Sequence, residues 1–270
     1  MSPATRVCRS QEDVGSPPLR AVVTVGNFDG VHRGHQDLIR KVVVRARKLG
    51  GEAWAVTFHP HPSKVLAPEH APALLTTLEQ RLELLAALGL DATLVLPFNH
   101  EFAQLSPRQF VSLILREKLA ARVVYVGPNF RFGHHAAGDV SVLAELAREF
   151  EFELEVVPPV NFRGQIVSST LIRHLVAEGR VERAARLLGR PYSLTGAIKP
   201  GAGRGRQIGV PTLNLAPQQE CLPARGVYIT ETLLGRQTYP SATNLGLRPT
   251  FGGEHQVVES HLLGFSETVT

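Results

Sequence analysis

Two histidines one helical turn apart, His32 and His35, are the residues of this sequence with the clearest chemical potential. They follow an Asp29-Gly30 turn, and Gly34 between them removes a side chain that would block a ligand. Imidazoles spaced in this way face the same side of a helix, and the free N–H groups of a helix start attract anions. The pattern predicts polyphosphate binding. The alternatives are a turn cap plus a core histidine, or a zinc site, which two histidines alone make poorly.

The elements that must position these histidines can be read from the hydrophobic period. Residues 21–25 form a short apolar, β-branched run typical of a buried strand, and residues 26–30 are turn material. From Val31 onward apolar residues recur at helical spacing. The segment therefore reads as strand, glycine-rich turn and helix, which is half of a βαβ unit. Nucleotides bind at the open end of such units.

A second group of phosphate donors is predicted at a later helix start. Ser168, Ser169 and Thr170 crowd together there, and Arg173 follows where the first helical turn closes. Taken alone, this is equally well explained by a hydroxyl cap beside an exposed arginine. Hydroxyls, helix N–H groups and an arginine are also the donors that hold a leaving pyrophosphate. Together with the two histidines, they favour a site that contacts phosphates from two sides.

The composition and the hydrophobic pattern of the chain change at Arg190-Pro191. Before that point apolar strands, expected over residues 53–58, 92–96, 123–127 and 152–157, alternate with amphipathic helices, one of which is expected to start at Ser106-Pro107. This alternation indicates a doubly wound α/β domain with a parallel sheet. After it, glycine and proline are dense and short β-type runs dominate, which indicates a small antiparallel β domain. We therefore expect a loose lead-in over residues 1–18, an α/β domain over 19–190 and a small β-barrel domain over 191–270.

Composition excludes several classes of protein. The chain has 270 residues, of which 43% are hydrophobic, enough for a real core. No apolar run approaches the roughly 20 residues of a membrane span, and no secretory leader is evident. Cys8 and Cys221 make no disulfide framework, so we expect a reducing, cytoplasmic setting. The net charge of +5 is spread over the chain. We expect small-molecule substrates, with neither nucleic acid nor membrane as partner; weak self-association is compatible with the sequence.

A third segment is the loop over residues 129–133, which mixes aromatics with an arginine and precedes Gly138-Asp139. By itself it reads as a loop pinned by two buried aromatic rings. In combination, the blocks GNFDGVHRGH, TFHPHP, VGPNFRFG…AGD and VSSTLIR resemble the bacterial bifunctional riboflavin kinase and FAD synthetase. They occur in that order and cover most of residues 20–190.

The resemblance implies that FMN attacks the α-phosphate of MgATP in the first domain, giving FAD and pyrophosphate. It implies that the phosphates are neutralised by five residues: His32, His35, Ser169, Thr170 and Arg173. It further implies contacts to ATP or flavin from Gly26, Phe28, Asp29, Gly30, Gly34, Asn129, Phe130, Arg131, Phe132, Gly133, Asp139 and Ser168. We expect Asp29 on the metal or ribose side. At residue 129 the family commonly has Asp, so Asn129 keeps an acceptor oxygen and drops the charge.

The resemblance continues into the second domain, where residues 201–215 are similar to the riboflavin kinase loop. Gly203 and Arg206 are expected to cradle phosphates, and Thr212 and Asn214 offer hard oxygens for Mg²⁺. Glu259, on an alternating strand, is implied as the base for a ribityl hydroxyl of riboflavin. The plainer interpretation of this loop is a flexible basic linker. Because the family's kinase domain continues beyond such a strand, we expect either that the sequence is cut short at Thr270 or that the barrel lacks its closing elements.

Two other functions stay open at this point. One is a different nucleotidylyltransferase, with a pantetheine-phosphate or nicotinamide nucleotide acceptor. The other is a non-catalytic flavin or nucleotide sensor that uses the basic loop after residue 198 to touch nucleic acid. The 129–133 block and the Pro-Thr-x-Asn loop argue against the first, and the lack of an aromatic-basic platform argues against the second.

Overall fold

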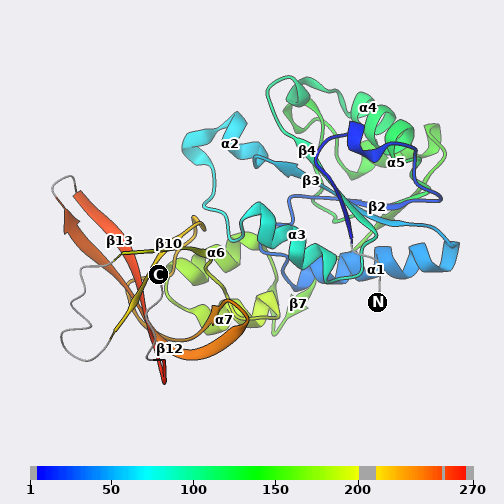
Figure 1. Ribbon diagram of the computed structural model, residues 1–270. Coiled ribbons are helices and arrows are strands. Elements are labelled where there is room, and N and C mark those ends of the chain that lie inside the picture. The colour runs from blue at the N-terminus through cyan, green and yellow to red at the C-terminus, as the bar shows by residue number, and fades with distance from the viewer. Residues whose placement is uncertain (1–4, 201–210, 251–252, 266–270) are drawn as a thin grey trace. The chain divides into compact units, whose positions relative to one another are not determined.

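The computed structural model describes residues 5–200, 211–250 and 253–265, and the chain forms two compact units (Figure 1). The first unit comprises Met1–Pro72 and Thr76–Ser169, and the second Ala73–Leu75 and Thr170–Thr270. The units thus divide after Ser169, whereas the sequence composition predicts a domain boundary at Arg190-Pro191. Two helices between these points group with the second unit, and the domain boundary at 190/191 stays a prediction.

The first unit is built on a six-stranded parallel sheet, so the doubly wound α/β prediction is confirmed. The strand order is β1-β4-β3-β2-β5-β6. The strands are β1 (Arg6–Cys8), β2 (Val22–Val25), β3 (Ala53–His59), β4 (Ala92–Pro97), β5 (Val123–Val126) and β6 (Glu153–Val156). Since β2 pairs with β3 on one side and β5 on the other, the order reverses at β2, where α/β proteins bind ligands.

Part of the lead-in predicted to be loose is regular structure. Strand β1 pairs with β4 in parallel, and a short 3-10 helix (Glu12–Val14) follows it. Cys8 and Val14 are buried in the same core cluster as Trp54. The prediction was wrong here because a strand of three residues is too short to show an alternating hydrophobic pattern. Only its pairing with β4 identifies it as a strand.

Helices cover both faces of this sheet, and alternate residues of each strand face opposite cores. The helices are α1 (Arg33–Leu49), α2 (Pro62–Leu66), α3 (Leu78–Ala86), α4 (Pro107–Phe110), the π-helix Val111–Lys118 and α5 (Val140–Glu149). Val22 and Ala53 pack with α1 and α3, while Val23 and Trp54 pack with α4, the π-helix and α5. Short 3-10 turns lie at Pro68–His70, Phe102–Gln104 and His134–Ala136, and β7 (Asn161–Phe162) pairs with β8 (Gln165–Ile166).

Side-chain caps fix where these helices begin. The predicted start at Ser106-Pro107 is confirmed: Ser106 accepts from the Gln109 N–H at 3.2 Å, and Gln109 accepts in return from the Ser106 N–H at 2.9 Å. Thr77 and Gln80 form the same reciprocal box at the start of α3. Such caps satisfy N–H groups that have no partner within the helix.

The second unit combines two helices with a five-stranded antiparallel sheet, as expected for the small β domain. The helices are α6 (Ser169–Ala177), which belongs to this unit from its second residue, and α7 (Val181–Leu188). The strands are β9 (Gly196–Lys199), β10 (Leu213–Pro217), β11 (Gly226–Leu234), β12 (Gln237–Thr250) and β13 (Gly253–Leu262), in the order β11-β12-β13-β10-β9. No helix in the described ranges is long and apolar enough to cross a membrane.

Candidate functional site

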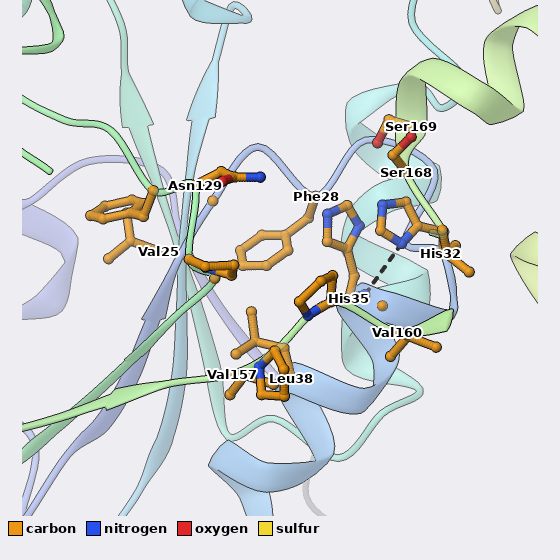
Figure 2. A pocket seen from close by; sticks show the side chains of 18 residues that line it. Val25, Phe28, His32, His35, Leu38, Asn129, Val157, Val160, Ser168 and Ser169 are labelled. Atoms are coloured by element: carbon orange, nitrogen blue, oxygen red, sulfur yellow. Dashed lines mark hydrogen bonds between the residues drawn. The ribbon is translucent and has the colours of Figure 1, made fainter. Parts of the chain in front are cut away.

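A cavity of about 360 Å³ lies in the first unit, at the carboxyl ends of β2, β5 and β6 (Figure 2). It is lined by Val25, Gly26, Phe28, His32, Gly34, His35, Leu38, Gly127, Pro128, Asn129, Phe130, Val157, Pro158, Pro159, Val160, Val167, Ser168 and Ser169. These residues come from the strand ends, the start of α1 and the segment before α6. The cavity therefore occupies the reversal point of the sheet, as the βαβ interpretation expects.

His32 and His35 stack on each other in the wall of this cavity. Their ring centroids are 3.6 Å apart and the ring planes differ by 16°. His32 is buried, and its Nδ1 accepts the backbone N–H of His35 at 3.3 Å, so that His32 is the N-cap of α1. The edge of Phe28 meets the ring of His35, with 5.3 Å between the centroids. Figure 2 shows the two imidazoles between Phe28 and the serines Ser168 and Ser169.

The environment keeps His35 neutral in the free chain. Burial is the largest cause that lowers its pKa, well below 6.5, and the neighbouring His32 and Arg81 add to this effect. A positive imidazole in such a place is unfavourable until a negative charge arrives. A phosphate entering the cavity would raise the pKa of His35 and so draw a proton onto the ring.

Asp29 does not line the cavity. It is 2% exposed, and one carboxylate oxygen accepts both the backbone N–H and the hydroxyl of Thr76 at 3.2 Å each. The carbonyl of Asp29 accepts the Ser169 hydroxyl at 2.9 Å, and the Gly30 N–H donates to the Thr76 hydroxyl at 3.2 Å. Asp29 thus ties the turn after β2 to Thr76. Its predicted role beside a metal or ribose stays a prediction.

The structure gives a second, steric reason why residue 34 is a glycine. A Cβ built on Gly34 would lie 3.1 Å from Cε1 of His32, closer than most real contacts. A side chain there would push against the His32 ring, which caps the helix and faces the cavity. The absence of a side chain at Gly34 therefore lets the His32 ring keep its stacked position and also leaves space for a ligand.

The loop after β5 contributes two of its predicted residues to the cavity wall, Asn129 and Phe130. Phe130 stacks on Phe132 with 5.2 Å between ring centroids, and Phe132 is buried in the core. Asp139 is the N-cap of α5, accepting the N–H groups of the two residues numbered 141 and 142, and it pairs with Arg131 at 3.2 Å. The backbone bond from residue 142 is the largest cause that lowers the pKa of Asp139.

Further predicted residues of the first unit, of α6 and of the glycine-rich loop are placed as follows. Within the first unit, Gly30, Arg131, Phe132, Gly133 and Asp139 do not line the cavity. Thr170 and Arg173 lie on α6 in the second unit. Gly203 and Arg206 lie outside the described residues.

Sequence reasoning missed half of the cavity wall. The missed lining residues are Val25, Leu38, Gly127, Pro128, Val157, Pro158, Pro159, Val160 and Val167. The available signal was positional: residues 127–128 and 157–160 lie at, or directly after, the last residue of a predicted strand. The carboxyl ends of neighbouring parallel strands meet at one sheet edge, but only the strand order shows that β6 and β5 adjoin β2.

In the second unit, sheet register brings the predicted kinase residues together. Asn214 of β10 pairs with Glu259 of β13, and Glu259 pairs in turn with Asn244 of β12. Residues directly opposite on neighbouring strands share a face of the sheet. Thr212 directly precedes β10, next to this row. The predicted roles of Thr212 and Asn214 at Mg²⁺ and of Glu259 as the base stay predictions.

The parallel sheet, the reversal-point cavity and the stacked pair of His32 and His35 make the first unit a nucleotide-binding α/β domain, and its H-x-G-H pattern at residues 32–35 resembles the signature of the nucleotidylyltransferases. Comparison with known families agrees with this class and refines it. Residues 16–171 match the model of FAD synthetase, and residues 188–270 match that of riboflavin kinase. The first match alone covers more than half of the chain.

Individual relatives extend over nearly the whole chain. The bifunctional riboflavin kinase/FMN adenylyltransferase of Escherichia coli K12 is 36% identical over 92% of this chain and 80% of its own length. The enzyme of that name from Pseudomonas fluorescens is 37% identical over 91% and 79%. A crystal structure from Streptococcus pneumoniae described as a macrolide-efflux protein superposes with a TM-score of 0.87 at 31% identity, covering 98% of this chain and 86% of that one. The chain belongs to the family of bifunctional riboflavin kinase/FMN adenylyltransferases.

Proposed function

We propose that the chain transfers an adenylyl group from MgATP to FMN, giving FAD and pyrophosphate, and phosphorylates riboflavin to FMN in its second unit. The stacked pair of His32 and His35 in the wall of the cavity is the observation that carries the first activity. The alternatives, a different nucleotide acceptor or a sensor, lack the two family matches that support flavin chemistry here. The two buried free cysteines suit the reducing cytoplasm as the setting.

The adenylyl transfer depends on positioning and charge neutralisation. A phosphate oxygen of FMN attacks the α-phosphorus of ATP, and the bond from that phosphorus to the leaving pyrophosphate breaks. His32, His35 and the hydroxyl of Ser168 line the cavity and would donate to phosphate oxygens as charge moves onto the leaving group. Ser169 shares this wall while its hydroxyl bonds to the carbonyl of Asp29. Thr170 and Arg173 lie in the second unit, and the role at the pyrophosphate that the sequence implies for them stays a prediction.

The flavin is assigned to the loop after β5. Asn129 and Phe130 line the cavity, and the Phe130 ring is supported from behind by the stacked Phe132. A supported aromatic ring offers a rigid apolar surface to a planar ring system. Arg131, paired with Asp139, lies on the same loop and would meet the FMN side of the reaction.

The kinase reaction is assigned to the row on the antiparallel sheet. Thr212 and Asn214 would hold Mg²⁺, which when bound neutralises the phosphates of ATP. Glu259, opposite Asn214 in the register, takes the proton from the ribityl hydroxyl as that oxygen attacks the γ-phosphorus. ADP leaves, and the product FMN is the substrate of the first unit. Gly203 and Arg206 are assigned to the phosphates of ATP.

Product analysis with the whole chain tests both activities. Incubation with FMN, ATP and Mg²⁺ should give FAD and pyrophosphate in equal amounts, and incubation with riboflavin, ATP and Mg²⁺ should give FMN and ADP. Pantetheine phosphate and nicotinamide mononucleotide serve as control acceptors. Adenylylation of a control acceptor in preference to FMN, or bound flavin without any product, would contradict the proposal.

A further inference from the structure

Arg81 is a buried cation that the proposed reaction does not use. It lies on the amphipathic helix α3 and is only 1% exposed. It is thus on the buried side of the helix, together with the leucines. Removing a guanidinium from water costs several kcal/mol unless its partners compensate. Its Nε has no hydrogen-bond partner among the described residues. An arginine buried at this cost, with part of its donor set unused, calls for an explanation beyond helix packing.

The guanidinium reaches the ends of two neighbouring strands through one nitrogen. Nη1 of Arg81 donates to the carbonyl of Asn27 at 2.9 Å, to the hydroxyl of Thr57 at 3.2 Å and to the carbonyl of Phe58 at 3.4 Å. The Thr57 hydroxyl donates to the same Asn27 carbonyl at 3.3 Å. Arg81 therefore clamps the first residues after β2 to the end of β3.

The segment held by this clamp has an unfavourable backbone. Phe28 and Val31 adopt φ angles of 49° and 39°, in the left-handed region that aromatic and β-branched residues rarely occupy. Such conformations persist only where the surroundings over-determine them, and they gather at functional sites. Asn27 is the residue directly before Phe28, so its clamped carbonyl fixes the peptide that enters the strained turn.

Phe28 lines the cavity and its edge meets the ring of His35. The far end of the turn runs directly into His32, the N-cap of α1. A turn released from its anchor could relax toward an ordinary conformation, which would move the Phe28 ring and the start of the helix together. The geometry of both imidazoles thus depends on the anchoring of residues 27–31.

We propose that Arg81 is a positioning residue of the adenylyl-transfer site: it clamps the Asn27 carbonyl and thereby holds Phe28 and the His32–His35 pair in the arrangement that receives ATP. This inference rests on the proposed function of the cavity. The positive charge of Arg81 is also felt at the site, since it is one of the causes that lower the pKa of His35, after burial and His32. Asp29 balances that charge electrostatically within the same turn.

The test compares Arg81→Met, Arg81→Lys and the matched control Arg47→Met in the full chain. Arg47 pairs with Asp91 at 2.7 Å on the surface, away from the cavity wall. The measurements are kcat and KM for ATP and FMN in FAD formation, together with the thermal midpoint of unfolding. For Arg81→Met, loss of bonds to a charged donor should raise KM for ATP by about 10- to 100-fold.

Arg81→Lys retains the charge and one donor direction, so it should recover part of the ATP affinity. Arg47→Met should leave KM for ATP within about twofold of wild type, because exposed ion pairs contribute little. A lower midpoint and lower kcat in Arg81→Met and Arg81→Lys, with KM for ATP unchanged, would show a merely structural arginine and overturn the proposal.

Two further measurements keep the outcome decisive. If Arg81→Met fails to fold, Thr57→Val removes the shared hydroxyl and should raise KM for ATP by roughly 2- to 10-fold; unchanged KM in both Thr57→Val and Arg81→Lys would overturn the proposal. Calorimetry with α,β-methylene ATP measures nucleotide binding directly. A wild-type chain that binds this analogue but makes no FAD contradicts the proposed function alone, and weaker binding by Arg81→Lys than by Arg47→Met would still support the clamp.

Discussion

The two candidate sites are assembled in opposite ways. In the first unit, the cavity wall comes from three strand ends, one helix start and the segment before α6, joined by side-chain caps and a strained turn. In the second unit, Asn214, Glu259 and Asn244 are neighbours because three antiparallel strands pair in register. Backbone ladders hold the second arrangement, whereas individual side chains hold the first.

This difference predicts how each site responds to change. A residue in a sheet row can be altered while its neighbours stay in register, since the backbone bonds are untouched. A residue in the cavity wall also supports other parts of that wall, as His32 does by capping α1. Substitutions should therefore act on one chemical step in the second unit, and on geometry as well as chemistry in the first.

The largest effect is expected for Glu259→Gln, which removes the proposed base and keeps the side-chain volume. FMN formation from riboflavin and ATP should fall about 10²- to 10⁴-fold, while FAD formation from supplied FMN stays at the wild-type rate. The control is Glu231→Gln, on an exposed position of β11. A kinase rate within a few-fold of wild type would remove Glu259 from the chemistry, and loss of both activities would break the contrast between the sites.

His35→Ala should lower FAD formation about 10²- to 10³-fold, the usual loss when one donor to a developing negative charge is removed. Kinase turnover of riboflavin should remain. Because the ring of His35 stacks on His32 and meets Phe28, KM for ATP should rise together with the fall in kcat. His70→Ala, at an exposed histidine, is the matched control. An intact KM would indicate that the cavity wall is less interdependent than its contacts suggest.

The smallest effect is an acid sensitivity of stability. Burial, with His32 and Arg81, lowers the pKa of His35 in the folded chain, so the unfolded chain takes up this proton first as the pH falls below 6.5. Stability should then decrease on acidification by up to about 1.4 kcal/mol per pH unit from this group. Urea unfolding of wild type and His35→Gln between pH 7.5 and 5.5 measures it. Equal pH slopes for the two proteins would contradict the assignment.

Much of the fold could be predicted from local sequence. The starts of α1 and α4 were foreseen because cap residues and apolar periodicity are local signals, and the strands β3, β4 and β5 because buried parallel strands are continuous apolar runs. Strand β10 was read as part of a loop, since its apolar residues follow a glycine-rich segment. Helix α7 was missed altogether, although its leucines and alanines recur at helical spacing.

The candidate site was only half predictable, for a physical reason. His32, His35 and Ser168 stand out by their chemistry, whereas Val157 and Val160 are ordinary apolar residues whose place in the cavity follows from the strand order. Arg81 shows the same limit: in the sequence it is a charged residue of an amphipathic helix, and only tertiary contacts reveal that it is buried. The chemistry of a side chain is evident from the sequence, but whether a residue lines the cavity or supports its wall depends on the assembled tertiary structure.

The cap formed by His32 fixes the tautomer of its neutral ring. Because Nδ1 of His32 accepts the His35 N–H, neutral His32 carries its proton on Nε2, and a second proton could enter only at Nδ1. That proton would end the bond and cost α1 its N-cap, worth about 1 kcal/mol. Nδ1 of His35 has no hydrogen-bond partner among the described residues. With Nδ1 used by the cap, the neutral ring of His32 has an N–H donor, Nε2–H, and no second ring acceptor to offer a nucleotide.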